Sequence, residues 1–391
     1  MKLAFYYHVP ITQKNGELYC SGLLGVFLDE LALHTSTLTL FMHEANQKEI
    51  KYCDYQLKAR NINFINMGIK TPAWDRFLFP KKNLLKITNE IKKVDSVIVR
   101  APSPLAPQFY DLFNKLTQVC YLVVGDYVNG VKYLHQPLWR KIPIKYLSIR
   151  NDKQLTRSLK QTLTLVNSNA LLDRYKKEVK NISLVRTTTL SNKDFYMRKS
   201  TCLDNEIKLL YTGRLDIAKG LRELIKATAI LHKQQVNVSL HLVAWEDDTK
   251  KPTEKKLKGI ANSLGIIDKV HFHGKKRLGI ELNNMYRMAD IYVLPSYHEG
   301  FPRTIWEAMA NGLPVIATKV GGIPMAVGNN VELIEPHDPK LISNAVLKLL
   351  QNPKRVEQLI KNGYLLAQKN TLEIRVSEIF NTINKNLINE K

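Results

Sequence analysis

The sequence lacks the features that mark membrane-spanning and secreted chains. It contains no run of 18 apolar residues, so no segment is predicted to span a bilayer. The first ten residues have a strand-like pattern rather than an apolar secretory core with a cleavage site. The few cysteines form no C-x-x-C pair and no metal-ligand spacing, which predicts free thiols in a reducing compartment. These absences favour a cytoplasmic protein.

Acidic residues are scarce relative to basic ones. The 391 residues include 58 Lys and Arg against 35 Asp and Glu, which gives a net charge of +23. Such an excess favours an anionic partner, whether nucleic acid, acidic lipid or a phosphorylated small molecule. A basic solvated surface without a partner is the alternative. Charge alone therefore limits the partner class without choosing one.

Short apolar runs rich in Val, Ile and Leu alternate with longer helical patterns along the whole chain. Continuous hydrophobicity in short runs is typical of parallel strands covered by helices on both faces. The runs are too many for one compact sheet, so the sequence predicts two doubly wound, Rossmann-like α/β domains. We expect an N-terminal domain over 1–190, a C-terminal domain over 191–370, and a final helix over 371–391 that crosses back to the first.

The segment 210–220 carries two cations directly after a predicted strand. Arg214 offers a planar fork of donors and Lys219 a point charge, and a helix opens near Gly220. Two cations beside a helix N-terminus suit a diphosphate. A solvated loop with two surface cations is the alternative.

The segment 290–318 reads as strand, glycine loop, helix and strand. Pro302 suits the first helical turn, and Gly312 suits the left-handed residue that ends the helix. The helix start then presents free amides to a phosphate or a sugar hydroxyl; this loop comprises Gly300, Phe301, Pro302, Arg303 and Thr304. Glu299 lies in the loop, and Glu307 lies within the helix, where a ribose diol would supply hydrogen-bond donors. The E-x7-E spacing occurs elsewhere by chance, but only this pair straddles a helix start after a strand.

A glycine turn, Gly321-Gly322, follows the next predicted strand. Glycine lets the backbone approach a ligand closely, and it serves a purely structural turn equally well. Both interpretations stay open at this point.

Taken together, these motifs resemble glycosyltransferase family 4, within the group 1 glycosyltransferases. The resemblance rests on Gly213-Arg214-Leu215 with Lys219-Gly220, on H-F-H-G at 271–274, and on L-P-S-x2-E-G-F-P-x4-E-A-M-A with the later V-G-G-I-P; it is dense over 209–324. It implies a GT-B fold, with two Rossmann-like domains facing a cleft. It also implies a retaining enzyme that takes a sugar from a nucleotide-diphosphate sugar. The acceptor would be a saccharide or a lipid-linked molecule in bacterial cell-surface polysaccharide biosynthesis.

The resemblance also implies roles for single residues. Arg214 and Lys219 match the diphosphate-binding pair, Glu299 the glutamate at the donor sugar, and Glu307 the one that holds the ribose. The loop 300–304 matches the backbone over the phosphates.

The N-terminal half departs from the family pattern. Gly16 follows the first strand and is assigned to the N-terminal glycine loop, although the usual double glycine is absent. Asp126 stands where many relatives have His-Asp, and we expect it to orient the acceptor hydroxyl. A turn aspartate that caps the next helix is the alternative.

No Asp-x-Asp motif occurs, and the histidines do not cluster with carboxylates at ligand spacing. We therefore expect metal independence and no cofactor beyond the donor substrate. The resemblance implies that the leaving phosphate itself accepts the proton of the acceptor. A non-catalytic GT-B binding or scaffold protein is the alternative to an enzyme.

Two stretches of the N-terminal half interleave aromatic and basic residues, 70–82 and 131–160. The second holds eight basic residues and one acid, with Trp139 and Tyr146 among them. Such a mixture suits an anionic bilayer surface, a nucleic-acid strand, or long stems that cover a helix face. Given the family resemblance, we expect docking on the inner face of the plasma membrane rather than nucleic-acid binding.

Overall fold

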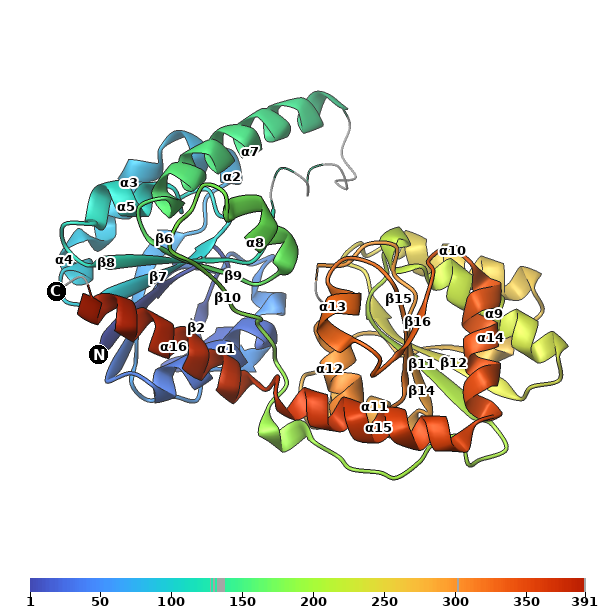
Figure 1. Cartoon of the computed structure of the whole chain (residues 1–391). Coiled ribbons are helices and arrows are strands. Elements are labelled where there is room, and N and C mark those ends of the chain that lie inside the picture. The colour runs from blue at the N-terminus through green and yellow to red at the C-terminus, as the bar shows by residue number, and fades with distance from the viewer. Residues whose placement is uncertain (127, 129–130, 132–137, 301, 390–391) are drawn as a thin grey trace. The chain divides into compact units, whose positions relative to one another are not determined.

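The computed structural model describes residues 1–126, 128, 131, 138–300 and 302–389. The chain divides into two compact units, one of residues 1–187 and 373–391 and the other of residues 188–372 (Figure 1). The sequence placed the division at residue 190. Each unit is described by itself below.

The N-terminal unit is built on a seven-stranded sheet in the order β10-β9-β8-β7-β1-β4-β6, and all paired strands are parallel. Its strands are β1 (Lys2–Tyr6), β4 (Thr37–Glu44), β6 (Ile62–Ile69), β7 (Ser96–Ala101), β8 (Gln118–Val123), β9 (Leu163–Val166) and β10 (Ile182–Leu184). Its helices are α1 (Gly22–Leu33), α2 (Ala73–Leu78), α3 (Pro80–Leu84), α4 (Thr88–Ile91), α5 (Gln108–Phe113), α7 (Leu138–Leu159), α8 (Asn169–Tyr175) and α16 (Leu372–Asn389). The strand order reverses between β1 and β7, the point where doubly wound sheets bind ligands.

A small antiparallel sheet, which the sequence analysis did not predict, follows β1. It consists of β2 (Thr12–Lys14), β3 (Glu17–Cys20) and β5 (Tyr55–Gln56). Asn15 and Gly16 form the two-residue turn between β2 and β3, and both have positive φ, as a tight hairpin turn requires. Gly16 thus lies at the tip of a hairpin within the connection from β1 to α1, which begins at Gly22, and its role at the donor stays a prediction.

The C-terminal unit is built on a six-stranded parallel sheet in the order β13-β12-β11-β14-β15-β16. Its strands are β11 (Ile207–Arg214), β12 (Val238–Trp245), β13 (Val270–Phe272), β14 (Ile291–Leu294), β15 (Val315–Thr318) and β16 (Glu332–Ile334). Its helices are α9 (Leu221–Lys233), α10 (Pro252–Ser263), α11 (Ile280–Met288), α12 (Arg303–Ala310), α13 (Ile323–Val327), α14 (Pro339–Leu350) and α15 (Pro353–Gln368). The order is that of a doubly wound sheet with its switch point between β11 and β14. Two Rossmann-like sheets are thus confirmed.

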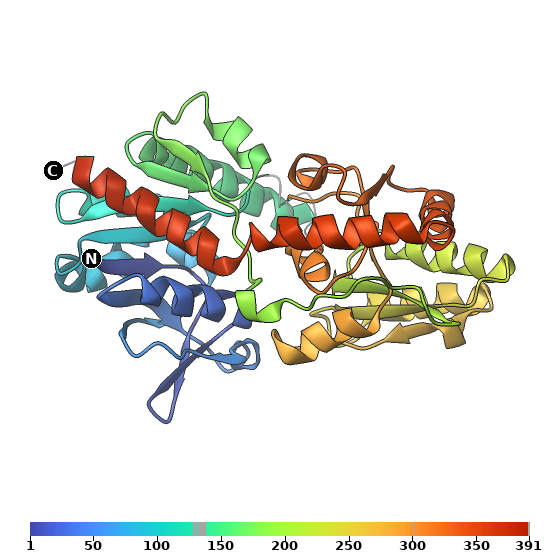
Figure 2. The ribbon, with the colours of Figure 1, turned by 60° about the horizontal axis from the view of Figure 1, so that its bottom comes forward.

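The last helix returns to the N-terminal unit. After α15, which belongs to the C-terminal unit, the chain continues into α16, most of which belongs to the N-terminal unit (Figure 2). There Asn386 Oδ1 accepts a hydrogen bond of 2.7 Å from Asn181 Nδ2, and the Phe380 ring lies 5.7 Å from that of His34. Within the described residues, no helix is both long enough and apolar enough to cross a membrane.

Candidate donor-binding site

The carboxyl ends of β11 and β14 bring the C-terminal candidates together at the switch point of the sheet. Arg214 is the last residue of β11, and Lys219 ends a short 3-10 helix, Ile217–Lys219. Glu299 and Gly300 lie in the loop that follows β14. Ligands of doubly wound sheets bind beyond this edge.

Gly220 allows two of these loops to interlock. It has a φ of 64° and precedes α9, and a Cβ at this position would overlap the carbonyl oxygen of Pro295. The Tyr297 amide donates a hydrogen bond of 2.8 Å to the Ala218 carbonyl across the same contact. The loop after β11 and the loop after β14 therefore hold each other in place.

Lys219 and Glu299 contact each other directly. Lys219 Nζ lies 2.7 Å from Glu299 Oε1, which also accepts a hydrogen bond of 2.6 Å from Ser296 Oγ. The Glu299 side chain is only 9% exposed, so this cation and hydroxyl offset the cost of burying its charge. Among the described residues no hydrogen bond reaches Oε2, which leaves this oxygen to accept one from a ligand hydroxyl.

The glycine turn 321–322 supports the Glu299 loop. The Gly322 amide donates a hydrogen bond of 3.0 Å to the Gly300 carbonyl, and a Cβ at Gly322 would lie 2.7 Å from that oxygen. A Cβ at Gly321 would overlap the carbonyl oxygen of Glu299. Of the two interpretations of Gly321-Gly322, the structure therefore supports a structural turn, which packs against the Glu299 loop.

Arg214 is the exposed cation of this edge. Its side chain makes no hydrogen bond or ion pair with any residue that the structure describes, while its carbonyl accepts a hydrogen bond of 3.0 Å from Tyr211. Gly213 is required beside it, because a Cβ there would lie 2.6 Å from the Tyr211 hydroxyl. The backbone is fixed and the guanidinium is available to an anion.

The helix α12 begins at Arg303, with Pro302 as its N-cap residue rather than in the first turn as predicted. At the start of the helix, the Ile305 amide donates a hydrogen bond of 3.4 Å to the Pro302 carbonyl. The amides of Arg303 and Thr304 have no acceptor among the described residues, so they can donate to a ligand. Burial lowers the pKa of Arg303. The helix ends as predicted, with Gly312 at a φ of 68°. Phe301, also assigned to this loop, lies outside the described residues.

Glu307 is already bound by two hydroxyls from distant parts of the unit. Thr189 Oγ1 donates a hydrogen bond of 3.0 Å to Oε1, and the Tyr286 hydroxyl donates one of 2.8 Å to Oε2. The Tyr286 hydroxyl also lies 2.7 Å from Thr212 Oγ1 on β11. Burial, with the charge of Glu307 second, raises the pKa of Tyr286 well above its usual range. Each carboxylate oxygen keeps further acceptor capacity, so a ribose diol fits this arrangement.

Sequence reasoning missed Thr189 and Tyr286. Both are separated from Glu307 along the chain, and nothing in the motif around Glu307 points to a hydroxyl partner. A carboxylate on the inner side of a helix needs hydrogen-bond donors, but the sequence does not say which residues supply them.

Asp126 lies in a charged network of the N-terminal unit. It forms an ion pair with Arg174, which also binds Asp152 Oδ2 at 2.5 Å. The Tyr175 hydroxyl donates a hydrogen bond of 3.1 Å to the other oxygen of Asp152. Asp126 is thus neutralised by a guanidinium that two carboxylates share, a partner that the sequence analysis did not identify.

The two doubly wound parallel sheets are those of a GT-B fold, and comparison with known families adds a match in the C-terminal unit. Residues 192–366 match the model of the family described as glycosyl transferases group 1. The C-terminal unit therefore contains a domain similar to the group 1 glycosyltransferases.

Relatives match the whole chain or its C-terminal part, and solved structures share its fold. Protein CapJ of Staphylococcus aureus is 26% identical over 100% of this chain and 97% of its own length. D-inositol 3-phosphate glycosyltransferase of Corynebacterium efficiens is 35% identical, but the match spans 36% of this chain and only 34% of that relative. Sucrose-phosphate synthase of Thermosynechococcus elongatus has a TM-score of 0.72 at 20% identity over the full length of both chains. Anabaena HepE, in complex with UDP and glucose, has a TM-score of 0.73 at 17% identity over 98% of this chain and 100% of its own. These structures confirm the GT-B fold.

Proposed function

We propose that the protein is a retaining, metal-independent family 4 glycosyltransferase. It moves a sugar from a nucleotide-diphosphate sugar, bound by the C-terminal unit, to a saccharide or lipid-linked acceptor bound by the N-terminal unit, in cell-surface polysaccharide biosynthesis. The observation that carries the proposal is the Lys219–Glu299 pair at the switch point of the sheet, beside Arg214, whose side chain has no partner among the described residues.

The charges of this edge match the charges that the reaction develops. As the bond from the anomeric carbon to the phosphate oxygen breaks, negative charge grows on the diphosphate, where Arg214, Lys219 and the start of α9 stabilise it. Positive charge grows on the sugar, where the buried carboxylate of Glu299 stabilises it. The acceptor oxygen bonds to the anomeric carbon on the face that the phosphate leaves, and its proton passes to the leaving phosphate. No protein base is required.

A binding screen with transfer assays tests the proposal. The Anabaena structures hold UDP and UDP-glucose, so UDP-sugars are measured first by calorimetry, followed by GDP-, ADP- and CMP-sugars. We expect one nucleotide class to bind, Lys219→Ala to weaken it, and Lys233→Ala, at an exposed residue at the other end of α9, to leave it unchanged. NMR of the product should show the anomeric configuration of the donor, and EDTA should not reduce the rate. No binding of any nucleotide sugar, an inverted product, or a rate below a tenth with EDTA would contradict the proposal.

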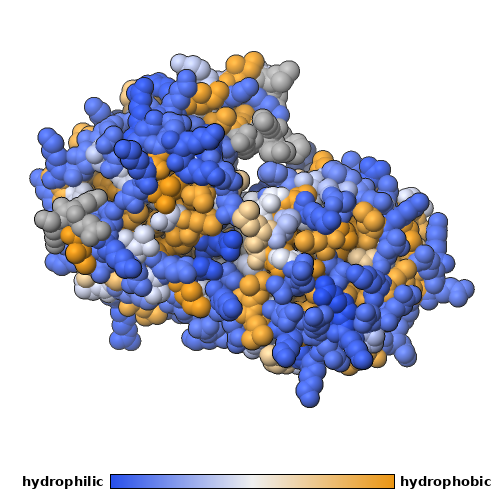
Figure 3. Space-filling model, in the orientation of Figure 1, coloured by the Kyte–Doolittle hydropathy of each residue, from blue (hydrophilic) through white to orange (hydrophobic). Residues whose placement is uncertain are grey.

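We also propose that α7 docks on an anionic membrane, which would bring the enzyme to a lipid-linked acceptor. Trp139, Ile142 and Tyr146 are 69%, 68% and 67% exposed, and their spacing places them on one face of the helix. Figure 3 shows apolar side chains gathered over the first turns of α7, with hydrophilic ones around them. Aromatic and aliphatic side chains on a basic helix are typical of segments that lie in the headgroup region.

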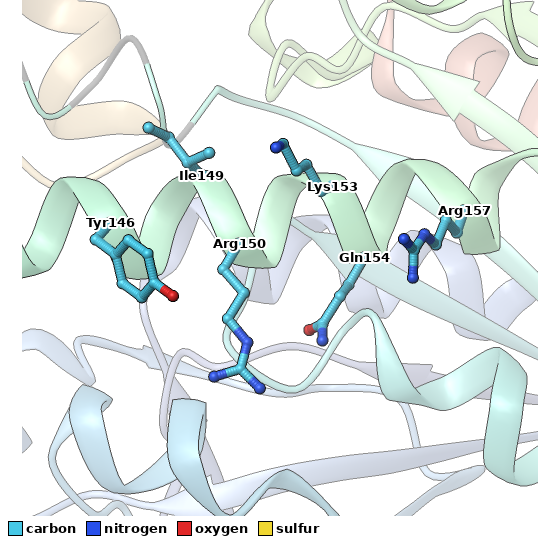
Figure 4. A pocket seen from close by; sticks show the side chains of 6 residues that line it. All are labelled: Tyr146, Ile149, Arg150, Lys153, Gln154 and Arg157. Atoms are coloured by element: carbon cyan, nitrogen blue, oxygen red, sulfur yellow. The ribbon is translucent and has the colours of Figure 1, made fainter.

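The cations of α7 supply the electrostatic part of this docking. Arg140, Lys141, Lys145, Arg150, Lys153 and Arg157 lie on the helix. The single acid of the helix, Asp152, is occupied by Arg174. Tyr146, Ile149, Arg150, Lys153, Gln154 and Arg157 line a hollow of about 270 Å³ (Figure 4). Each basic residue near an anionic surface contributes about 1 kcal/mol, so the helix favours acidic over neutral lipid.

Liposome flotation tests the docking. We expect the protein to float with vesicles that contain phosphatidylglycerol and to stay behind with pure phosphatidylcholine. Replacing Trp139, Ile142 and Tyr146 with Ser should abolish flotation, whereas Ser at the exposed apolar residues Leu33, Leu203 and Ile280 should not. Equal recovery with both lipids, or flotation that survives the α7 substitutions, would overturn the proposal.

A further inference from the structure

A second group of basic side chains, other than those of α7 and the donor site, lies at the carboxyl edge of the N-terminal sheet. It comprises His8 after β1, His43 near the end of β4, Lys70 after β6, Arg100 near the end of β7, and Arg76 in α2. These four strands are neighbours in the order β7-β1-β4-β6, and all run parallel. Their ends therefore meet at one edge, which includes the switch point between β1 and β7.

Arg76 is buried without an ionic partner. Its side chain is 4% exposed, and its Nε donates a hydrogen bond of 3.1 Å to the Thr71 carbonyl. Its Nη1 is buried and has no hydrogen-bond partner, and Arg76 forms no ion pair with any described residue. Burying a guanidinium without a compensating anion is costly, so a site of this kind is completed by an anion that the chain does not supply.

Other polar atoms of the same edge are unsatisfied as well. His43 is fully buried; its Nδ1 lies 3.3 Å from the Gly68 carbonyl, and its Nε2 has no partner among the described residues. Nδ1 of His8 and Oγ1 of Thr71 are likewise buried without a hydrogen bond in the described structure. Native proteins leave few buried polar atoms unpaired, so four at one sheet edge indicate a missing polar ligand.

The potential at this edge is positive. Burial, followed by the charges of Lys70, Arg76 and Arg100, lowers the pKa of His8 to about 3. Lys70 Nζ has an acidic partner, Glu49 Oε1 at 2.5 Å, which compensates one cation. The Arg100 guanidinium lies 4.6 Å from the centre of the Tyr7 ring. The positive charge of this edge therefore favours anion binding and disfavours the protonated form of the His8 imidazole.

We propose that this edge binds a phosphate group carried by the acceptor, held by Arg76, Lys70 and Arg100 with the Thr71 hydroxyl. The proposal rests on the proposed function in one respect only, that the acceptor binds the N-terminal unit. Cations from three separate elements surround a tetrahedral group with several oxygens better than a planar carboxylate, which one guanidinium fork would satisfy.

Calorimetry with inorganic phosphate at constant ionic strength tests the binding. Arg76→Gln should weaken phosphate at least tenfold and Lys70→Gln at least threefold. Lys93→Gln, which removes an exposed cation of the same unit, should change nothing. Circular dichroism shows whether Arg76→Gln folds. If it does not, the phosphate affinity of Lys70→Gln tests the proposal, because this variant alters only a partly exposed side chain. Equal affinity in the wild type and in the folded Arg76 or Lys70 variants would overturn the proposal.

Two further titrations identify the source of the phosphate. A hexose phosphate should bind through the same residues and the unphosphorylated hexose should not; binding of inorganic phosphate alone would refute the acceptor assignment. Saturating UDP should leave the affinity for phosphate unchanged, whereas competition would assign the edge to the donor diphosphate instead. None of these measurements requires catalysis, so a failure of the proposed transfer reaction would be seen separately, in the donor screen.

Discussion

The backbone of Gly321 packs directly on the carbonyl oxygen of Glu299, so closely that a Cβ at residue 321 would overlap it. The carboxylate at the donor site is therefore positioned from two sides. The side chain is held by Lys219 and Ser296, and the main chain by the glycine turn after β15. Gly321 thus helps to determine the position of Glu299, without itself having to contact a ligand.

Gly321→Ala should displace the Glu299 loop. The Cβ forces the loop away from its place beside Lys219, so we expect kcat/KM to fall at least tenfold. Gly328→Ala is a matched control, because Gly328 also has a positive φ, 53°, but a Cβ there has no neighbour within 4 Å. Both variants should lose at least about 1 kcal/mol of stability, because a residue with a Cβ is strained at a positive φ. Equal kinetics in the two variants would show that the contact with Glu299 has no functional consequence.

Glu299→Gln should slow transfer more than it weakens nucleotide binding. The amide keeps the shape of the side chain but removes the negative charge that faces the developing positive charge on the sugar, so kcat should fall about a hundredfold. Affinity for the free nucleoside diphosphate, which has no sugar, should change less than threefold by calorimetry.

The control for this charge is Glu335→Gln, which removes the acid of an exposed lysine pair, 3.1 Å from Lys319. It should leave kcat unchanged. A loss of kcat in Glu335→Gln comparable to that in Glu299→Gln would assign the effect to net charge and not to the site.

The sequence was sufficient for features that depend on local pattern. Continuous apolar runs predicted the parallel sheets, and the position of Gly312 predicted the left-handed end of α12. Contacts between segments far apart in the chain could not be predicted from the sequence. The pairing of Lys219 with Glu299 and of Thr189 with Glu307 depends on how loops meet at a sheet edge, which one-dimensional spacing does not encode.

The N-terminal unit shows the same limit. Asn15-Gly16 is a strong hairpin signal, but the sequence analysis considered Gly16 only as part of a ligand loop and did not predict the hairpin. The group of basic side chains around Arg76 could not be found from sequence, because its members come from four strand ends and a helix that meet only in the fold. The chain has 58 Lys and Arg residues, and none of them can be singled out as a buried ligand-binding cation until its burial is known.

Tyr286→Phe should loosen Glu307. The variant removes one of the two hydroxyl donors to this partly buried carboxylate, which should cost about 1–2 kcal/mol of stability and weaken nucleotide binding several-fold. Tyr292→Phe is the matched control, since Tyr292 is equally buried but its hydroxyl contacts Thr212 rather than Glu307. Urea unfolding and nucleotide calorimetry measure the two effects. A wild-type nucleotide affinity in Tyr286→Phe would argue against a ribose-holding role for Glu307.

His241 should make the C-terminal unit sensitive to mild acid. Burial, together with the charges of His271 and His273, lowers the pKa of His241 to about 4, and its Nδ1 lies 2.9 Å from His273 Nε2. An unfolded histidine titrates near pH 6.5, so the folded state binds fewer protons than the unfolded state between pH 6.5 and 4. Stability is therefore fully present above pH 6.5 and is lost as the pH falls toward 4, by about 1–2 kcal/mol at pH 5 for this residue. Urea unfolding at pH 7 and pH 5 should show a smaller loss in His241→Asn than in the wild type, whereas the exposed His232→Asn should behave as the wild type. If the acid-induced loss is the same in all three proteins, the histidine cluster does not set the acid stability of this unit.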